Sequence, residues 1–275
     1  MKSLCFLACT LALASFAAAD IPRGILSNIA GSSTNRTPGY PGQLFWSNAS
    51  AFGRIHASPN GNNFIFAGAV GESPTRRALI AGEADSPSTW TTPLFEGQAW
   101  PLGGGLLTGS TKTTAGIDDL GFIVCSTTTN EASSANDYIL RISGTTYDVV
   151  AREGQVAPGQ TFTFQTVMGA AHIGGNGEAI FQSGGNSGTA SGGLWIDETL
   201  ISQRGVSIPQ GQFNGASDVV TRYGNENYRV SPDLSVAMFQ GRVGTNTTLD
   251  DVVVVNDVVV CQEGFALGLA PGAGL

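Results

Sequence analysis

The sequence predicts an all-β fold, a propeller-like array of four-stranded blades, and three observations support this prediction. Glycine is abundant, with 38 residues in a chain of 275, while charged residues make up only 12%. Three separate sequence markers recur with one period of about 57 residues. Short apolar segments alternate with turn residues, and no long window shows the 3.6-residue apolar period of a helix. Composition and periodicity together therefore favour many short strands joined by turns.

The first marker is a proline turn, seen most clearly in the segment Gly154–Gln160. The second is a polar turn followed by a strand, and the third is a strand that ends in Glu-Gly or Arg-Gly. The turn prolines are Pro41, Pro101, Pro158, Pro209 and Pro271, and the equivalent strand residues are Phe66, Cys125, Phe181 and Phe239. The three phenylalanines at this repeat position are expected to be buried between neighbouring blades. These markers divide the chain into units over 41–100, 101–157, 158–208 and 209–270.

Within the third unit the segments 162–167, 178–182, 193–196 and 200–204 are predicted strands. Asp197-Glu198, and Asn256-Asp257 in the fourth unit, are predicted two-residue hairpin turns because each separates two apolar segments. Four strands in a unit of this length are typical of a propeller blade. Stacked blades bury the two faces that a single four-stranded sheet would expose. A β-solenoid is the alternative, although its coils are usually shorter, about 20–30 residues.

The N-terminal residues resemble an export signal. Lys2 is a short basic region, Leu4–Phe16 is apolar, and Ala17–Ala19 supply small residues before the expected cleavage at Asp20. The prediction is a signal peptide over 1–19 and one repeat domain over 20–275. The expected location is therefore extracellular or on the cell surface, with no transmembrane segment in the mature chain.

The charge balance limits the classes of partner. The formal net charge is −8, and nucleic-acid binding depends on Lys and Arg side chains that neutralise phosphates. The sequence therefore predicts no nucleic-acid partner and disfavours an anionic membrane surface. After cleavage Cys125 and Cys261 remain, and two distant cysteines at different repeat positions predict no disulfide framework.

No catalytic residue and no cofactor are predicted. The two histidines, His56 and His172, each precede a predicted strand, which favours a strand-end histidine bonded to a turn over a catalytic base. Asp118, Asp119 and Asp233 recur at similar positions of their units. Side chains that bond the backbone of their own turn explain this recurrence, and calcium held by oxygen-rich loops is the alternative.

Tryptophan offers the one candidate for ligand contact. Trp195 lies in an apolar segment and is expected in the core, whereas Trp100 lies beside Pro101 in a predicted turn. Trp100 is therefore the predicted ligand-binding residue, because aromatic rings can stack on sugars.

The order Ala151-Arg152-Glu153-Gly154-Gln155-Val156-Ala157-Pro158-Gly159, followed by Gly177-Glu178-Ala179-Ile180-Phe181, resembles secreted bacterial tandem-repeat proteins. Such proteins often carry a C-terminal sorting anchor of the PEP-CTERM type. The resemblance covers essentially the mature chain and implies a propeller-like surface or extracellular protein. The sequence departs from that pattern in one respect. No apolar segment with a basic end follows Gly264, which leaves envelope attachment open.

Two function classes follow. The first is a non-catalytic secreted or cell-surface repeat protein, a scaffold or a binding module for glycan or protein. The second is an extracellular propeller hydrolase or lyase with a site at the central channel. Ala270-Pro271-Gly272 repeats the turn that opens each earlier unit. The chain is therefore expected either to close a ring of four or five blades or to be a truncated piece of a longer protein.

Overall fold

The computed structural model describes residues 52–70, 76–103, 105–108, 115–167, 171–184 and 192–265. The predicted signal peptide and the turns at Pro41 and Pro271 lie outside these residues. The described chain forms strands β1 to β18, which pair antiparallel into four sheets. Its helical structure is a short 3-10 turn, η2, over Pro87–Thr89. The prediction of an all-β protein is confirmed.

Each sheet has a simple antiparallel order that follows the chain. Sheets I and IV each contain four strands, in the orders β1-β2-β3-β4 and β15-β16-β17-β18. Their bounds are β1 Phe52–Ala57, β2 Asn63–Val70, β3 Arg76–Glu83, β4 Thr91–Phe95, β15 Val220–Val230, β16 Ala237–Val243, β17 Asp251–Val255 and β18 Val258–Gln262. This order lets neighbouring strands connect through short hairpins.

Sheets II and III each contain five strands, because the first strand position is filled by two short pieces. In sheet II, β5 and β6 both pair with β7, and in sheet III, β10 and β11 both pair with β12. The bounds are β5 Leu107–Thr108, β6 Ala115–Ile117, β7 Ile123–Thr129, β8 Asp137–Ser143, β9 Thr146–Arg152, β10 Gln165–Val167, β11 His172–Ile173, β12 Ala179–Gly184, β13 Gly193–Ile196 and β14 Thr199–Gln203. The four predicted strands of the third unit are found, and β11 was not predicted.

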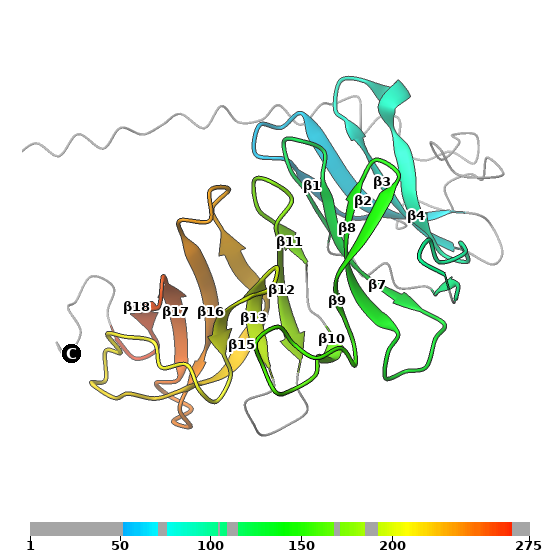
Figure 1. Cartoon of the computed structure of the whole chain (residues 1–275). Helices are drawn as coiled ribbons and strands as arrows, with labels where there is room; N and C mark the ends of the chain where they lie inside the picture. Colours follow the sequence, from blue (N-terminus) through cyan, green and yellow to red (C-terminus); the bar gives the residue numbers. More distant parts are fainter. Residues whose placement is uncertain are drawn as a thin grey trace, which may run out of the picture.

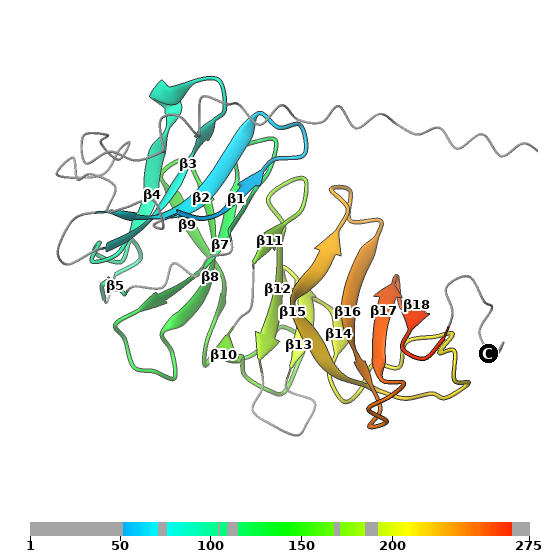
Figure 2. The same cartoon turned by 180° about the vertical axis from the view of Figure 1, so that it is seen from behind.

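The four sheets follow one another across the molecule in chain order, with sheets I and IV at opposite ends (Figures 1 and 2). One apolar cluster joins sheet I to sheet II through residues such as Ile65 and Cys125. A second joins sheet II to sheet III, and a third joins sheet III to sheet IV. Three layers of the core therefore lie between successive sheets, which is consistent with blade-like repeats, and a fourth cluster belongs to sheet I alone.

Strand alternation decides which neighbour each residue meets. In β12, Phe181 packs with the sheet II residues and Ile180 packs with the sheet IV residues. In β16, Phe239 is buried toward sheet III at 5% exposure. Phe66 is buried as well, in a cluster of sheet I residues that includes Phe64. All three residues are buried, as predicted, and Phe181 and Phe239 lie between neighbouring sheets. Among the described residues Phe66 packs only within sheet I.

The proline-turn segment forms the connection from one sheet to the next. Gly154 N–H donates to Phe164 O at 2.7 Å, and Ala157 N–H donates to Phe162 O at 3.0 Å. The same pattern occurs after sheet I, where Gly97 N–H donates to Leu107 O at 2.8 Å. Both glycines have φ near +80°, a conformation that glycine adopts without steric cost. The first marker of the sequence is thus a linker of defined geometry.

The two predicted hairpin turns are also confirmed. Ile196 pairs with Thr199 across Asp197-Glu198, and Val255 pairs with Val258 across Asn256-Asp257. Asp197, Asn256 and Asp257 all have positive φ, as tight hairpin turns require. Cys125 and Cys261 are both free, but only Cys125 is fully buried. Within the described chain we find no helix with the length and apolar character needed to cross a membrane.

Candidate functional site

The recurring acidic turns serve mainly to bond their own backbone. Asp118 Oδ1 accepts from Leu120 N–H at 2.9 Å and from Phe122 N–H at 2.8 Å. Burial raises the pKa of Asp118, and these backbone donors act against that rise. In the exposed turn of sheet IV, Asp233 Oδ1 accepts from Ser231 and Ser235, which lowers the pKa of Asp233 to about 2. The geometry matches the interpretation as self-bonding turns.

The Asp119 carboxylate contacts sheet I. Its Oδ1 accepts from Asn60 N–H at 2.9 Å, and Asn63 Nδ2 donates to Asp118 O at 3.0 Å. Asp119 therefore helps to hold sheet II against sheet I. The structure does not bring Asp118, Asp119 and Asp233 together into a group of possible metal ligands within the described ranges.

The two histidines lie in different sheets. His56 belongs to β1 and pairs in register with Ile65. His172 belongs to β11, where its Nε2 lies 2.7 Å from Arg229 Nη1. The His172 ring also packs edge-on against Tyr228, with centroids 5.0 Å apart. Both contacts of His172 lead to sheet IV, so it contributes to the junction between sheets III and IV.

Trp100, the predicted ligand-binding residue, is 5% exposed. Its ring lies 4.7 Å from that of Tyr138, centroid to centroid, in the cluster between sheets I and II. This position gives it a packing role in the fold. A role in ligand contact stays a prediction.

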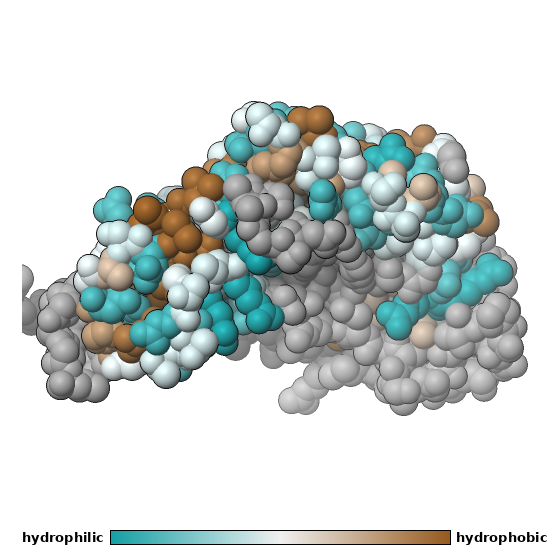
Figure 3. All heavy atoms as spheres, turned by 90° about the horizontal axis from the view of Figure 1, so that it is seen from below, coloured by the Kyte–Doolittle hydropathy of each residue, from teal (hydrophilic) through white to brown (hydrophobic). Residues whose placement is uncertain are grey.

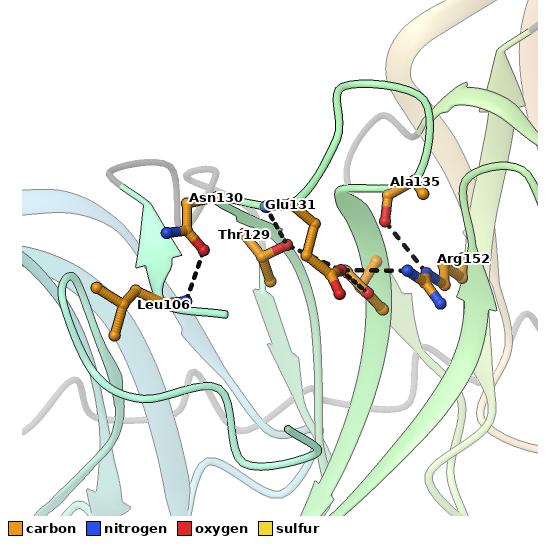
Figure 4. Close-up of polar contacts among 7 residues, drawn as sticks. Leu106, Thr129, Asn130, Glu131, Ala135 and Arg152 are labelled. Carbon is orange, nitrogen blue, oxygen red and sulfur yellow. Dashed lines mark hydrogen bonds and ion pairs between the residues drawn. The ribbon is translucent and has the colours of Figure 1, made fainter. Parts of the chain in front are cut away.

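Tyr138 also belongs to a polar network at one end of sheet II, drawn in Figure 4. Its hydroxyl donates to Glu131 Oε2, which also accepts from Arg152 Nη2 at 3.2 Å and from Thr129 Oγ1 at 3.2 Å. Arg152 donates in addition to Ala135 O at 3.1 Å. The shared acceptor Glu131 Oε2 links three side chains of sheet II, and this arrangement is typical of a structural anchor.

An open cleft of about 340 Å³ lies on sheet IV and is a candidate binding site. Its lining is polar and includes Arg222, Asn227, Gln240, Arg242 and Asp251. Asn227 Nδ2 donates to Gln240 Oε1 at 2.8 Å, which fixes both amides. Side chains with several donors and acceptors on rigid strands can orient a polar ligand.

The two arginines of the cleft, Arg222 and Arg242, differ in their hydrogen bonds and ion pairs. Arg242 Nε donates to Asp251 Oδ1 at 2.9 Å, and its Nη1 lies 3.6 Å from Asp250 Oδ2. For the Arg222 guanidinium, no hydrogen bond or ion pair is found to any part of the chain that the structure describes. The cleft therefore offers one guanidinium that is ready to bind an anion, with hydrogen-bonding amides beside it.

Sequence reasoning did not identify this cleft. Arg222, Gln240 and Arg242 follow no motif, and they meet only because β15 and β16 pair with Arg222 opposite Arg242. In the sequence Asp250 and Asp251 form only an adjacent pair. Glu263 joins that pair because the hairpin β17–β18 brings the two chain segments side by side. The cleft and this acidic group both depend on the pairing register of the strands, which could not be predicted from the sequence alone.

Comparisons with known proteins show no family for this chain. No protein-family model matches the chain. No curated protein matches it either. Two solved structures of glucose dehydrogenase are similar at 10% and 11% identity, each with a TM-score of 0.34. The alignments cover 82% of this chain and 75% and 74% of those chains. A likeness at this level carries no argument about fold or activity.

Proposed function

We propose that the chain is a secreted or cell-surface, non-catalytic repeat protein that acts as a binding module for a glycan bearing carboxylate groups. The cleft on sheet IV is the single observation that carries this proposal, because it presents the Arg222 guanidinium beside Asn227 and Gln240. Arginine binds a carboxylate through two parallel hydrogen bonds, and amides bond sugar hydroxyls.

The proposal takes the four sheets as consecutive blades of the 57-residue repeat. Strand register supports this view. In sheets II, III and IV the repeated residue of the second strand position pairs with a residue of the third. The pairs are Cys125 with Leu140, Phe181 with Trp195, and Phe239 with Val254. Each of the three also packs toward the preceding sheet. A propeller-like scaffold of this kind presents clefts on rigid strands.

Exposure distinguishes the cleft-bearing face of sheet IV, which supports a role in binding. Gln240 and Arg242 lie on the face of β16 opposite to the buried Phe239. In the repeat alignment Gln240 corresponds to Ala67 and Ser126, which are buried at 8% and 2% exposure, and to Gln182, which is half-buried. Sheets III and IV thus both carry glutamine at this position, but only Gln240 is exposed.

Affinity electrophoresis of the folded chain tests the proposal, with polygalacturonate as the acidic polymer and dextran as the neutral one. We expect retardation by polygalacturonate only. Arg222→Gln should raise the apparent Kd about tenfold, because a charge-assisted hydrogen bond contributes about 1.5–3 kcal/mol. Arg76→Gln, at an exposed arginine of sheet I, is the matched control and should bind like the wild type. Equal retardation of the two variants, or equal retardation by dextran, would contradict the proposal.

A further inference from the structure

Three acidic residues gather at one end of the hairpin β17–β18, separate from the recurring turns. Asp250 and Asp251 stand at the start of β17, and Glu263 follows directly after β18. Glu263 N–H donates to Asp251 O at 2.8 Å, which fixes the two segments side by side. One carboxylate oxygen from each of the three residues lies within 4.8 Å of the others.

The charge in this group is only partly neutralised. Arg242 contacts both aspartates, through Nε to Asp251 and through Nη1 to Asp250. Three carboxylates and one guanidinium leave a formal charge of −2. The Glu263 carboxylate has no hydrogen bond or ion pair with any described residue.

Asp250 supplies a second and independent observation. Asp250 is 4% exposed, and its Oδ1 is buried with no hydrogen-bond partner among the described residues. A buried carboxylate oxygen that lacks a partner is costly, because it has lost its water without replacement. Such an atom in a folded protein calls for an explanation, and a bound ion is one of the established ones.

We propose that Asp250, Asp251 and Glu263 form a calcium-binding site. Calcium takes oxygen ligands at about 2.3–2.6 Å, so two oxygens bound to one ion lie within about 5 Å of each other. The spacing of 4.8 Å or less meets this limit. A divalent ion also brings the formal charge of the group, with Arg242, to zero.

Calcium fits this group better than magnesium does. Magnesium demands near-ideal octahedral geometry and keeps several of its waters, whereas calcium accepts irregular sets of carboxylates. The site combines a buried, a half-buried and an exposed acid, which is an irregular set of three carboxylates of the kind that calcium accepts. The ion ties the start of β17 to the segment after β18 and places a positive charge beside the buried Asp250.

Two measurements on the folded chain test this proposal: equilibrium dialysis against Ca²⁺, and thermal unfolding with Ca²⁺ or with EDTA. We expect one bound Ca²⁺ per chain, with a Kd in the range of about 10⁻⁴–10⁻³ M that extracellular modules show. Saturating Ca²⁺ should raise the Tm by several degrees, because a ligand that binds only the folded state stabilises it. Mg²⁺ at the same concentration as Ca²⁺ should not displace the bound Ca²⁺.

The decisive variant is Glu263→Gln, since Glu263 is exposed and its replacement leaves the contacts of Arg242 in place. It should keep the Tm measured in EDTA, lose the calcium-dependent rise and bind Ca²⁺ at least tenfold more weakly. Glu198→Gln, at an exposed acid of the β13–β14 hairpin, is the matched control and should respond like the wild type. Absence of binding in the wild type, an unchanged Kd in Glu263→Gln, or equal binding of Mg²⁺ would overturn the proposal.

Discussion

The Arg141 guanidinium reaches from sheet II to sheet III and donates through Nη2 to the Asp197 carboxylate. Its Nε donates to Gly177 O at 2.6 Å, in the turn between β11 and β12. Asp197 itself stands in the β13–β14 hairpin with φ of 50°, and its Oδ1 also accepts from Ala179 N–H at 2.8 Å. One arginine of sheet II thus fixes two separate turns of sheet III.

This relationship predicts different outcomes for two substitutions of Asp197. Asp197→Asn keeps a residue that tolerates positive φ and retains an oxygen for Ala179 N–H, but it removes the charge. We expect a loss of at most about 1 kcal/mol, because the pair is partly exposed to water. Asp197→Ala removes the acceptor and strains the turn as well, so its loss should be about 2 kcal/mol. Urea unfolding of both variants checks the order, and equal losses would contradict it.

The layer between sheets II and III gives the largest predicted effect. Phe181 is fully buried, and its ring lies 6.4 Å from that of Trp195 and 5.9 Å from that of Phe164. Phe181→Ala should lower the free energy of unfolding by about 3–5 kcal/mol, since it leaves a cavity that the rigid strands cannot fill. Leu120→Ala, at a residue that is 68% exposed, is the control and should change stability by less than about 0.5 kcal/mol. A loss below about 1 kcal/mol for Phe181→Ala would count against this packing.

The order of the strands could be predicted because it depends on local signals. Asp197-Glu198 and Asn256-Asp257 are typical of hairpin turns, and the alternation around Phe181 places one face in a core. These signals act over a few residues and survive in any tertiary context. They predicted an all-β chain and the burial of the repeated aromatic position.

The candidate site could not be predicted in the same way, because it depends on long-range register. Arg222 and Arg242 are twenty positions apart, and a slip of one residue between β15 and β16 would send one of them to the other face. The strand β11 was missed for a related reason. Its two residues, His172 and Ile173, carry too little pattern and form a strand only through pairing with β12.

Two glycines in the linker after sheet II allow the energetic cost of backbone conformation to be measured separately from the cost of steric contact. Gly154 and Gly159 both have positive φ, at 80° and 67°. A Cβ at Gly154 would lie 2.8 Å from Ser134 O, whereas a Cβ at Gly159 would meet nothing within 4 Å. Gly159→Ala should therefore cost about 1–2 kcal/mol from the backbone alone, and Gly154→Ala should cost clearly more. The difference in urea midpoint between the two variants is the measurement, and a Gly159→Ala loss that equals or exceeds the other would contradict the steric argument.

The two free cysteines should differ in reactivity. Burial raises the pKa of the Cys125 thiol to about 12, so almost no thiolate forms near neutral pH. Cys261 is only half-buried. In a chain with Cys5 and Cys9 replaced by serine, a disulfide reagent at pH 8 should modify Cys261 first and Cys125 only after denaturant is added. Peptide mass mapping identifies the labelled residue, and rapid native labelling of Cys125 would show that the layer between sheets I and II is not closed.

Tyr138 makes the stability of the chain depend on alkaline pH. Burial, together with the hydrogen bond to the Glu131 carboxylate, raises the pKa of Tyr138 to about 12, from about 10 in an unfolded chain. The neutral phenol is therefore favoured in the folded state. Its contribution to stability is complete below about pH 10 and is lost as the pH rises toward about 12. Burial also raises the pKa of Tyr223, which adds to the loss in the same direction.

Urea unfolding at pH 8, 10 and 11 should show that the free energy of unfolding declines with pH, and that the decline is shallower in Tyr138→Phe. That variant should also be less stable at pH 8, because Glu131 loses a donor. Tyr147→Phe is the matched control, since it removes a hydroxyl that donates to Pro93 O at 2.9 Å while Tyr138 stays in place. It should keep the wild-type slope, and an equally steep decline in Tyr138→Phe would exclude Tyr138 as the cause.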